Sequence, residues 1–325
     1  MSEFSVRRVV TGFDAIGAEV FTHDGQAPNT VDAGPVGVSE LFWTDGSGLH
    51  VADDPDRTTP GFPLEPPPGG ISVRVIRMPG IPPGTEADDT WLRIDGDDPE
   101  VEGMHATDTL DLMVVLDGAV VLGLDDGERT VSAGEYVIQR GTGHRWRPAD
   151  HRGWTYMVAM LRPVADRADG HLPERIRPPT VGDSPVRRVV TGDVPLDGGA
   201  VTSVGSAFST LTDLWLTGGP LGAVDQGGDI NDGWTLEPVE GGVSFRLVEL
   251  SPELPLVDEL WHTTATIDVD VIVSGRVRLD LPGDVSTELG PGDVVVQRGT
   301  NHRWIALGHE PLRMATVMID AGADR

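Results

Sequence analysis

The strongest constraint on the fold is a long motif that occurs twice in the 325-residue sequence. The first copy runs from His105 to His144, and the second runs from His262 to His302. Both copies end with the same sequence, Gln-Arg-Gly-Thr-x-His-Arg-Trp, which follows a run of alternating polar and apolar residues. A repeat spaced by about half the chain predicts two similar structural units joined in one polypeptide.

Two shorter repeats support this division. Val-Arg-Arg-Val-Val-Thr-Gly stands at 6–12 and again at 186–192, and Gly-Gly-x-Ser-x-Arg stands at 69–74 and 241–246. Prolines and glycines interrupt the stretch between the halves, as is typical of a linker. We therefore expect an N-terminal module at 1–162, a linker at 163–184 and a C-terminal module at 185–325.

Composition points to an all-β protein. The apolar segments are short, and 42 glycines and 26 prolines supply turn residues between them. The absence of cysteine excludes disulfides and thiolate metal sites. A formal net charge of −28 argues against nucleic acid or an anionic membrane as partner. No apolar run has the length of a membrane span and no signal sequence is evident, so we expect a cytoplasmic protein.

The two motifs carry chemically useful side chains on one face. Side chains of an extended strand alternate between faces, so His105, Thr107 and Asp111 share one side. His262, Thr264 and Asp268 do the same in the second copy. A Gly-Thr turn precedes each closing histidine and would return the chain alongside. We therefore predict that the histidines and the aspartate of each copy converge, as two constellations: His105, Asp111 and His144; His262, Asp268 and His302.

These residues resemble the motifs of the cupin superfamily. The usual first cupin motif is His-x-His, three or four residues, Glu, six residues and Gly. Here Thr107 and Thr264 replace the second histidine and Asp111 and Asp268 replace the glutamate, each followed at the expected spacing by a glycine. The resemblance covers residues 70–161 and 242–319 and implies two jelly-roll β-barrels related by a pseudo-twofold axis, a bicupin.

The resemblance also implies a metal, with an altered ligand set. Metal-binding cupins typically use three histidines and one carboxylate, whereas each constellation here offers two histidines and one aspartate. That set matches the facial triad of Fe(II) oxygenases, so Fe(II) is the first choice, with Zn or Mn as alternatives. Two other interpretations stay open: polar residues that only hydrogen-bond one another, and a metal-free acid–base site.

Five further residues are candidates for a direct role. Thr107 and Thr264 would hold a water or a substrate oxygen, and Gln139 and Gln297 would either donate to a ligand or cap the turn. Asp270 shares the strand face of Asp268, unless a bulge turns it outward. Met113 fills that position in the first copy, so we expect two chemically unequal cavities.

The sequence thus predicts a metal-dependent enzyme of small oxygenated or aromatic molecules, with dioxygenase-type oxidoreductase activity as the first hypothesis. Isomerase, cyclase or lyase chemistry with Zn or no metal is the alternative within enzymes. A non-catalytic bicupin that binds a small molecule is the alternative outside them. The internal duplication suits either a monomer or a homodimer.

Overall fold

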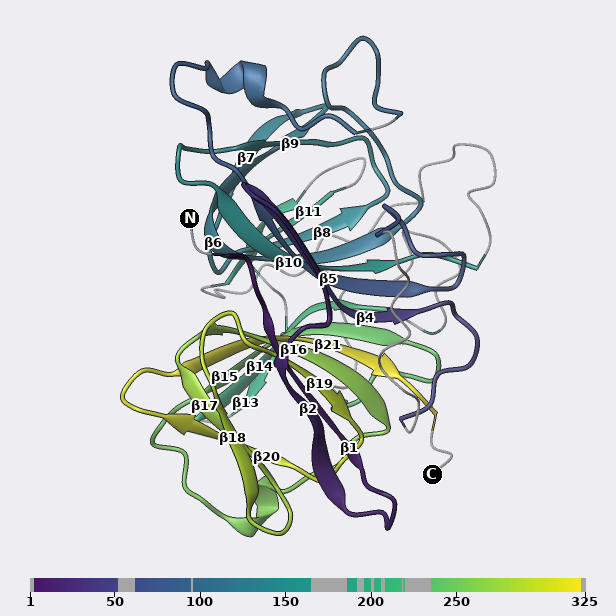
Figure 1. Ribbon diagram of the computed structural model, residues 1–325, viewed down its shortest axis with the longest axis vertical. Coiled ribbons are helices and arrows are strands. Elements are labelled where there is room, and N and C mark those ends of the chain that lie inside the picture. The colour runs from purple at the N-terminus through teal and green to yellow at the C-terminus, as the bar shows by residue number, and fades with distance from the viewer. Residues whose placement is uncertain are drawn as a thin grey trace.

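The computed structural model describes residues 3–51, 62–94, 96–164, 186–191, 196–199, 202–205, 208–217, 219 and 235–322. Within these ranges the chain is nearly all β-strand, with only two short 3-10 helices, η1 (Ala87–Thr90) and η2 (Asp258–Leu260). None of the helices described could cross a membrane. The predicted all-β class is confirmed, and Figure 1 shows two β-structured halves stacked one above the other.

The first half is built on a ten-stranded sheet. Eight of its strands follow one path, and β7 and β9 pair with the outer part of β6. The path runs through β12 (Leu196–Gly199), β11 (Arg187–Val190), β8 (Tyr136–Arg140), β6 (Leu110–Leu124), β10 (Trp154–Leu161), β5 (Ile71–Met78), β4 (Val36–Thr44) and β3 (Asn29–Ala33). The two additional strands are β7 (Gly127–Ser132) and β9 (Arg145–Pro148).

The second half has an eight-stranded sheet and a three-stranded sheet. The larger one runs through β2 (Glu19–Gln26), β1 (Arg7–Phe13), β19 (Val294–Arg298), β16 (Thr266–Ser274), β21 (Leu312–Asp320), β15 (Val243–Leu250), β14 (Ser209–Leu216) and β13 (Thr202–Gly205). The smaller one consists of β18 (Val285–Leu289), β17 (Arg276–Leu281) and β20 (Arg303–Leu307). The two long paths have the same order, strand for strand, as expected for two similar structural units encoded by a repeat.

The first two strands of each path come from the opposite half of the sequence. β1 pairs in parallel with β19, and β11 pairs in parallel with β8. In Figure 1 the purple strands β1 and β2 accordingly lie in the lower, green and yellow half. The sheets therefore do not follow the linear division at 162 and 185 that the sequence suggested. The expected linker itself falls almost wholly outside the described residues.

A glycine bends the central strand of each half at the position expected from the motif. Gly118 lies inside β6 with φ of 74°, and Gly275 separates β16 from β17 with φ of 79°. A Cβ atom at Gly118 would meet the Gly153 carbonyl oxygen at 2.2 Å, and one at Gly275 would meet the Pro311 carbonyl oxygen at 2.6 Å. Only glycine combines this backbone conformation with so close an approach.

The main core lies between the two sheets and contains residues of both halves. Leu41 and Phe42 of β4 belong to the same cluster as Trp215 of β14 and Phe245 of β15. The parallel β1 contributes Val10, which is fully buried. Strands covered on both faces favour such apolar residues, and this burial binds the two halves into one unit.

The exchanged strands suggest a specific test. The buried Thr11 hydroxyl of β1 donates to the Gln297 side-chain oxygen and accepts the Arg298 amide at 3.0 Å. Thr191, just after β11, accepts the Arg140 amide at 2.9 Å in the same way. Thr11→Val would leave buried polar groups unpaired and should cost about 1–3 kcal/mol of unfolding free energy. Hydrogen exchange should quicken at 297–302, although these residues are almost 290 positions away in the sequence.

Thr191→Val is the matched control. It should quicken exchange at 139–144 and leave 297–302 unchanged, because its partner belongs to the other half. Hydrogen exchange at both loops is measured by mass spectrometry. Equal effects of either variant on both loops would contradict the pairing of β1 with β19 and of β11 with β8.

Candidate functional site

The two histidines of each motif meet across a short antiparallel bridge. His105 and His144 exchange two backbone hydrogen bonds of 2.9 Å, and His262 and His302 do the same at 3.0 and 2.9 Å. The imidazole ring centroids lie 4.3 Å apart in the first half and 4.2 Å apart in the second. The predicted approach of the histidines is thus present in both halves.

All four histidines hold one ring nitrogen against a backbone carbonyl oxygen two residues earlier in the chain. The Nδ1 to oxygen distances are 2.9 Å for His105 to Gly103, 2.8 Å for His144 to Thr142, 3.0 Å for His262 to Leu260 and 2.9 Å for His302 to Thr300. A carbonyl oxygen only accepts, so Nδ1 carries the proton in each ring. The lone pair is then on Nε2, the arrangement in which histidine binds a metal.

Burial keeps the closing histidines uncharged. It lowers the pKa of His144 and of His302 to about 3, and the neighbouring histidine of each pair lowers it further in the same direction. Their side chains are 3% and 2% exposed. A protonated imidazole in such a place would lose its hydration and face a like charge, so both rings are neutral near pH 7.

The two candidate glutamines serve the turns that carry these histidines. The Gln139 amide nitrogen lies 2.8 Å from the Thr142 carbonyl oxygen, and Gln297 makes the same contact with Thr300 at 2.8 Å. Each amide nitrogen also lies close to Nδ1 of the closing histidine, and the two N–H groups donate to the same threonine carbonyl oxygen instead of to each other. Both glutamines are buried and face their own loop. Of the two roles considered for them, capping the turn or donating to a ligand, these contacts correspond to capping the turn. The glutamines thereby position the histidines.

The aspartates sit among threonine hydroxyls. Asp268 accepts the Thr266 hydroxyl at 2.5 Å on one oxygen and the Thr264 hydroxyl at 3.4 Å on the other. Burial raises the pKa of Asp268 to about 7 despite these bonds. In the first half, burial raises the pKa of Asp111 to about 7, and the Thr109 hydroxyl donates to Thr107 at 3.0 Å. Removal from water favours the protonated form of a carboxyl.

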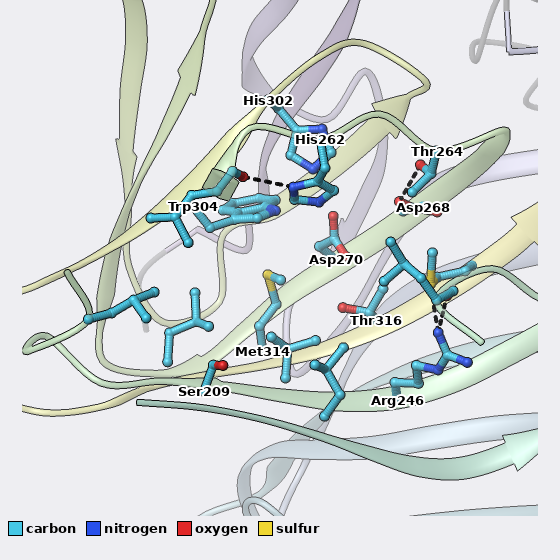
Figure 2. A pocket seen from close by; sticks show the side chains of 17 residues that line it. Ser209, Arg246, His262, Thr264, Asp268, Asp270, His302, Trp304, Met314 and Thr316 are labelled. Carbon is cyan, nitrogen blue, oxygen red and sulfur yellow. Dashed lines mark hydrogen bonds between the residues drawn. The ribbon is translucent and has the colours of Figure 1, made fainter. Parts of the chain in front are cut away.

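The second constellation opens into a cavity of about 340 Å³. His262, His302, Asp268 and Thr264 line one part of it, and Asp270 also faces it, as strand parity predicted. In Figure 2 the two imidazoles lie next to each other, with Asp270 beneath them. Burial raises the pKa of Asp270 well above its usual value, and neighbouring Asp268 raises it further. The remaining wall is mostly apolar.

The equivalent space in the first half is lined differently. Asp270 pairs across strands with Thr316, whereas Met113 pairs with Val158 at the same place. Trp154 and Tyr156 stack at 4.4 Å between ring centroids in the first half, with Trp146 next to Trp154. The second half has Leu312 and Met314 in place of the Trp154–Tyr156 pair. Large rings thus occupy the first interior where smaller aliphatic side chains line the second.

The ligand set for a metal is only partly assembled. Each half presents two imidazoles side by side whose Nδ1 atoms face backbone carbonyls, which leaves their Nε2 atoms as a suitable pair of ligands for a divalent ion. Within the described residues, however, no three histidine or carboxyl groups come close enough to hold one ion together. The histidine pairs therefore fit a metal, and a carboxyl of the same cavity would have to move to complete the set.

The sequence was compared with those of known proteins. No protein-family profile matches the sequence. Phomopsin biosynthesis cluster protein C′ of Diaporthe leptostromiformis is 33% identical over 159 residues, covering 46% of this chain and 75% of the relative. The cupin-domain-containing oxidoreductase fogC of Aspergillus ruber is 33% identical over 87 residues, covering 25% of this chain and 40% of that protein.

A solved structure extends the likeness over both halves. A Pseudomonas aeruginosa protein, described as a candidate glyoxylate-induced protein, superposes with a TM-score of 0.51 at 11% identity. The match covers 91% of this chain and 86% of that chain, and at this identity it shows the fold alone. The chain is a two-barrel member of the cupin superfamily. The resemblance inferred from the two motifs is confirmed.

Sequence reasoning missed the body of the bicupin's cavity. Trp304, Met314 and Thr316 line it, yet only Trp304 belongs to the repeated motif. Met314 and Thr316 belong to β21, which pairs with β16, so they share the face of Asp268 and Asp270 through cross-strand register. The largely apolar sequence of β21 predicts a buried strand, but the identity of its partner strand comes from the tertiary structure.

The lowered histidine pKa predicts how the stability of the metal-free bicupin depends on pH. The folded-state pKa of His144 is about 3 and the ordinary value is 6.5, so the unfolded chain binds the proton first as pH falls. This ring's share of stability is complete above 6.5 and declines below it. By pH 5 the loss should be about 2 kcal/mol. His144→Asn, which keeps a donor near the Thr142 carbonyl, should reduce the fall between pH 7.5 and 5 by that amount.

The exposed His309 offers a control, since His309→Asn should leave the pH dependence of unfolding as it is. Urea titrations of chelator-treated protein at both pH values measure the difference. If the unfolding free energy of His144→Asn falls between pH 7.5 and 5 as much as that of the unaltered protein, the His144 ring is protonated in the folded state.

Proposed function

We propose that this bicupin is an oxidoreductase of small oxygenated or aromatic molecules, and that its reaction takes place in the C-terminal barrel. The observation that carries the proposal is a mostly apolar cavity that ends in a pair of histidines and two carboxyls. Such a site combines room for an organic ring with groups that bind metals or move protons. The oxidoreductase name of the Aspergillus ruber relative supports the same reaction class.

A divalent metal would be held by His262 and His302 through Nε2, with Asp268 or Asp270 as the oxygen ligand. Fe(II) is the first choice, and Zn or Mn are alternatives with the same ligand preferences. Bound there, Fe(II) would supply redox chemistry and open coordination positions, as a dioxygenase-type reaction requires. His105, His144 and Asp111 form a second, predicted site in the first barrel.

The residues of the chain have separable tasks in this proposal. The Thr300 and Leu260 carbonyls fix the tautomer of His302 and His262, so that the Nε2 atoms are available without a conformational search. The apolar wall excludes water, which strengthens every polar interaction at the end of the cavity. Asp270 can hold a proton on its carboxyl and return it to a substrate oxygen nearby.

Metal content tests the proposal directly. Chelator-treated protein, reconstituted with Fe(II), Zn or Mn, should bind the ion with an affinity that falls roughly 100-fold or more in His302→Ala. His262→Ala should behave in the same way, because the two rings are neighbours. Elemental analysis and calorimetric titration measure the effect, and oxygen uptake with metal-loaded protein tests the reaction class.

The matched variants His105→Ala and His144→Ala report on the first barrel. If they remove the metal while His262→Ala and His302→Ala retain it, the working site belongs to the first barrel and the proposal is wrong. Loss of metal from neither pair would contradict metal dependence altogether.

Isomerase, cyclase or lyase chemistry without metal is the second candidate. Its supporting observation is that two carboxyls with raised pKa share the cavity, while the described residues gather no three-ligand set. Asp268 near its pKa of about 7 could exchange a proton with substrate at neutral pH. Turnover that persists after complete chelation and disappears in Asp268→Asn would favour this reaction class over the oxidoreductase.

A further inference from the structure

The first barrel contains a continuous row of aromatic rings that begins at its histidine pair. The ring centroids of His144 and Trp146 lie 5.7 Å apart, and those of Trp146 and Trp154 lie 6.2 Å apart. Tyr156 stacks on Trp154 at 4.4 Å, with an interplanar angle of 15°. The row therefore leads from the histidines on β9 to β10 and ends at Tyr156.

The second barrel begins the same row and ends it after one ring. His302 and Trp304 repeat the first contact, at 5.9 Å between centroids. Leu312 and Met314 then stand at the register positions that the last two rings occupy in the first barrel. Because the second barrel forms without these two rings, they are a property of the first barrel and not a requirement of the fold.

Tyr156 faces the interior of the first barrel. Along β10, Met157 and Ala159 are fully buried in the core between the two large sheets, so the alternate residues point the other way. Trp154 is 2% exposed, as is usual for a ring within a core. Tyr156 and Trp146 pack against the same interior cluster and yet remain partly exposed. Part of the surface of Tyr156 therefore borders open space.

This surface suits a planar aromatic molecule better than a saturated one of the same size. Aromatic rings favour offset-stacked arrangements, and a stacked pair is stabilised beyond the effect of the area that it buries. Among the described residues, Trp154 is the only ring in contact with Tyr156, so the row can be continued on the other side of the phenol ring. Ile76 and Met78 of β5 supply apolar side chains beside it. A barrel of this size can hold one small ligand.

We infer that the first barrel binds a small, uncharged, planar aromatic molecule, which stacks on Tyr156 and continues the row of rings. This site is separate from the cavity of the C-terminal barrel. The inference goes beyond the oxidoreductase function, since it requires neither a metal nor a reaction. The bicupin then has two cavities of different selectivity, and Tyr156 in the first barrel and Met314 in the second are the corresponding residues that set the difference.

The tyrosine content of the chain makes the site accessible to chemical labelling. The chain has two tyrosines and no cysteine to compete for tetranitromethane. This reagent should nitrate Tyr156 in chelator-treated protein and leave Tyr136, which is 0% exposed, unmodified. Naphthalene-2-carboxamide and its decahydro analogue share a carbon skeleton and an uncharged polar group, and only the first is planar. The planar probe should protect Tyr156 at about a tenfold lower concentration, as measured by mass spectrometry.

Three results of the labelling experiment would overturn the inference. If Tyr156 resists nitration as Tyr136 does, its ring is ordinary core packing. Equal protection by the two carboxamides would show that the site does not distinguish a planar ring from a saturated one. Protection by neither probe, up to the limit of its solubility, would show that the site binds no such molecule.

Two substitutions locate the selectivity. Tyr156→Met installs the residue of the second barrel and should weaken binding of naphthalene-2-carboxamide in the first barrel about tenfold. Tyr156→Phe keeps the ring and should bind as the unaltered protein does. NMR of methyl-labelled methionine reports on the barrels separately, because Met78 packs in the first and Met314 lines the cavity of the second. An unchanged titration of the Met78 signal in Tyr156→Met would contradict the inference. If Tyr156→Met does not fold, the labelling of the unaltered protein still decides.

The inference and the proposed function fail independently. Selective protection of Tyr156, in a protein that holds no metal and consumes no oxygen, would leave the inference standing while the oxidoreductase proposal fails. Metal binding at His262 and His302 with oxygen uptake, together with a Tyr156 that neither probe protects, would produce the opposite result.

Discussion

The interaction on which the rest of the structure depends is the parallel pairing of an exchanged strand with the strand that leads into each histidine loop. β1 covers the edge of β19, and β11 covers the edge of β8. Thr11 at the end of β1 then bonds both Gln297 and the Arg298 amide. Gln297 holds the Thr300 turn, and that turn orients His302. A residue from the first tenth of the chain thus supports the site of the last quarter.

This dependence explains why the two halves share one core. An edge strand has unpaired backbone groups, and each half lacks the strand that would cover its own edge. The opposite half supplies it, and burial of Val10, Trp215 and Phe245 in a common cluster stabilises the exchange. Each histidine loop is therefore held against a strand from the opposite half of the sequence. Duplication of the motif produced one structural unit with two sites rather than two separable domains.

The two sites nevertheless differ in what they can accommodate. The backbone bridge between histidines and the Nδ1 contacts are the same in both halves. The side chains that line the two interiors differ. Stacked Trp154 and Tyr156 occupy the first interior, whereas Asp270 and Thr316 add polar groups to the second. Burial acts on both sites by lowering the pKa of the closing histidines His144 and His302 and by raising the pKa of Asp111 and Asp268.

The sequence by itself determined the all-β class, the duplication and the meeting of His105 with His144 and of His262 with His302. These follow from the period of two along a strand and from the glycines that bend it, which are local properties. It also placed Asp270 towards the interior. Only the tertiary structure decided which strand lies next to which: the exchange of β1 and β11, the bond from Thr11 to Gln297 and the apolar wall from β21. Strand pairing between distant segments depends on packing of the whole core, and no local pattern encodes its partner. For the same reason the sequence could not show that Asp268 bonds to threonines instead of joining the histidines, since that depends on distances across the barrel.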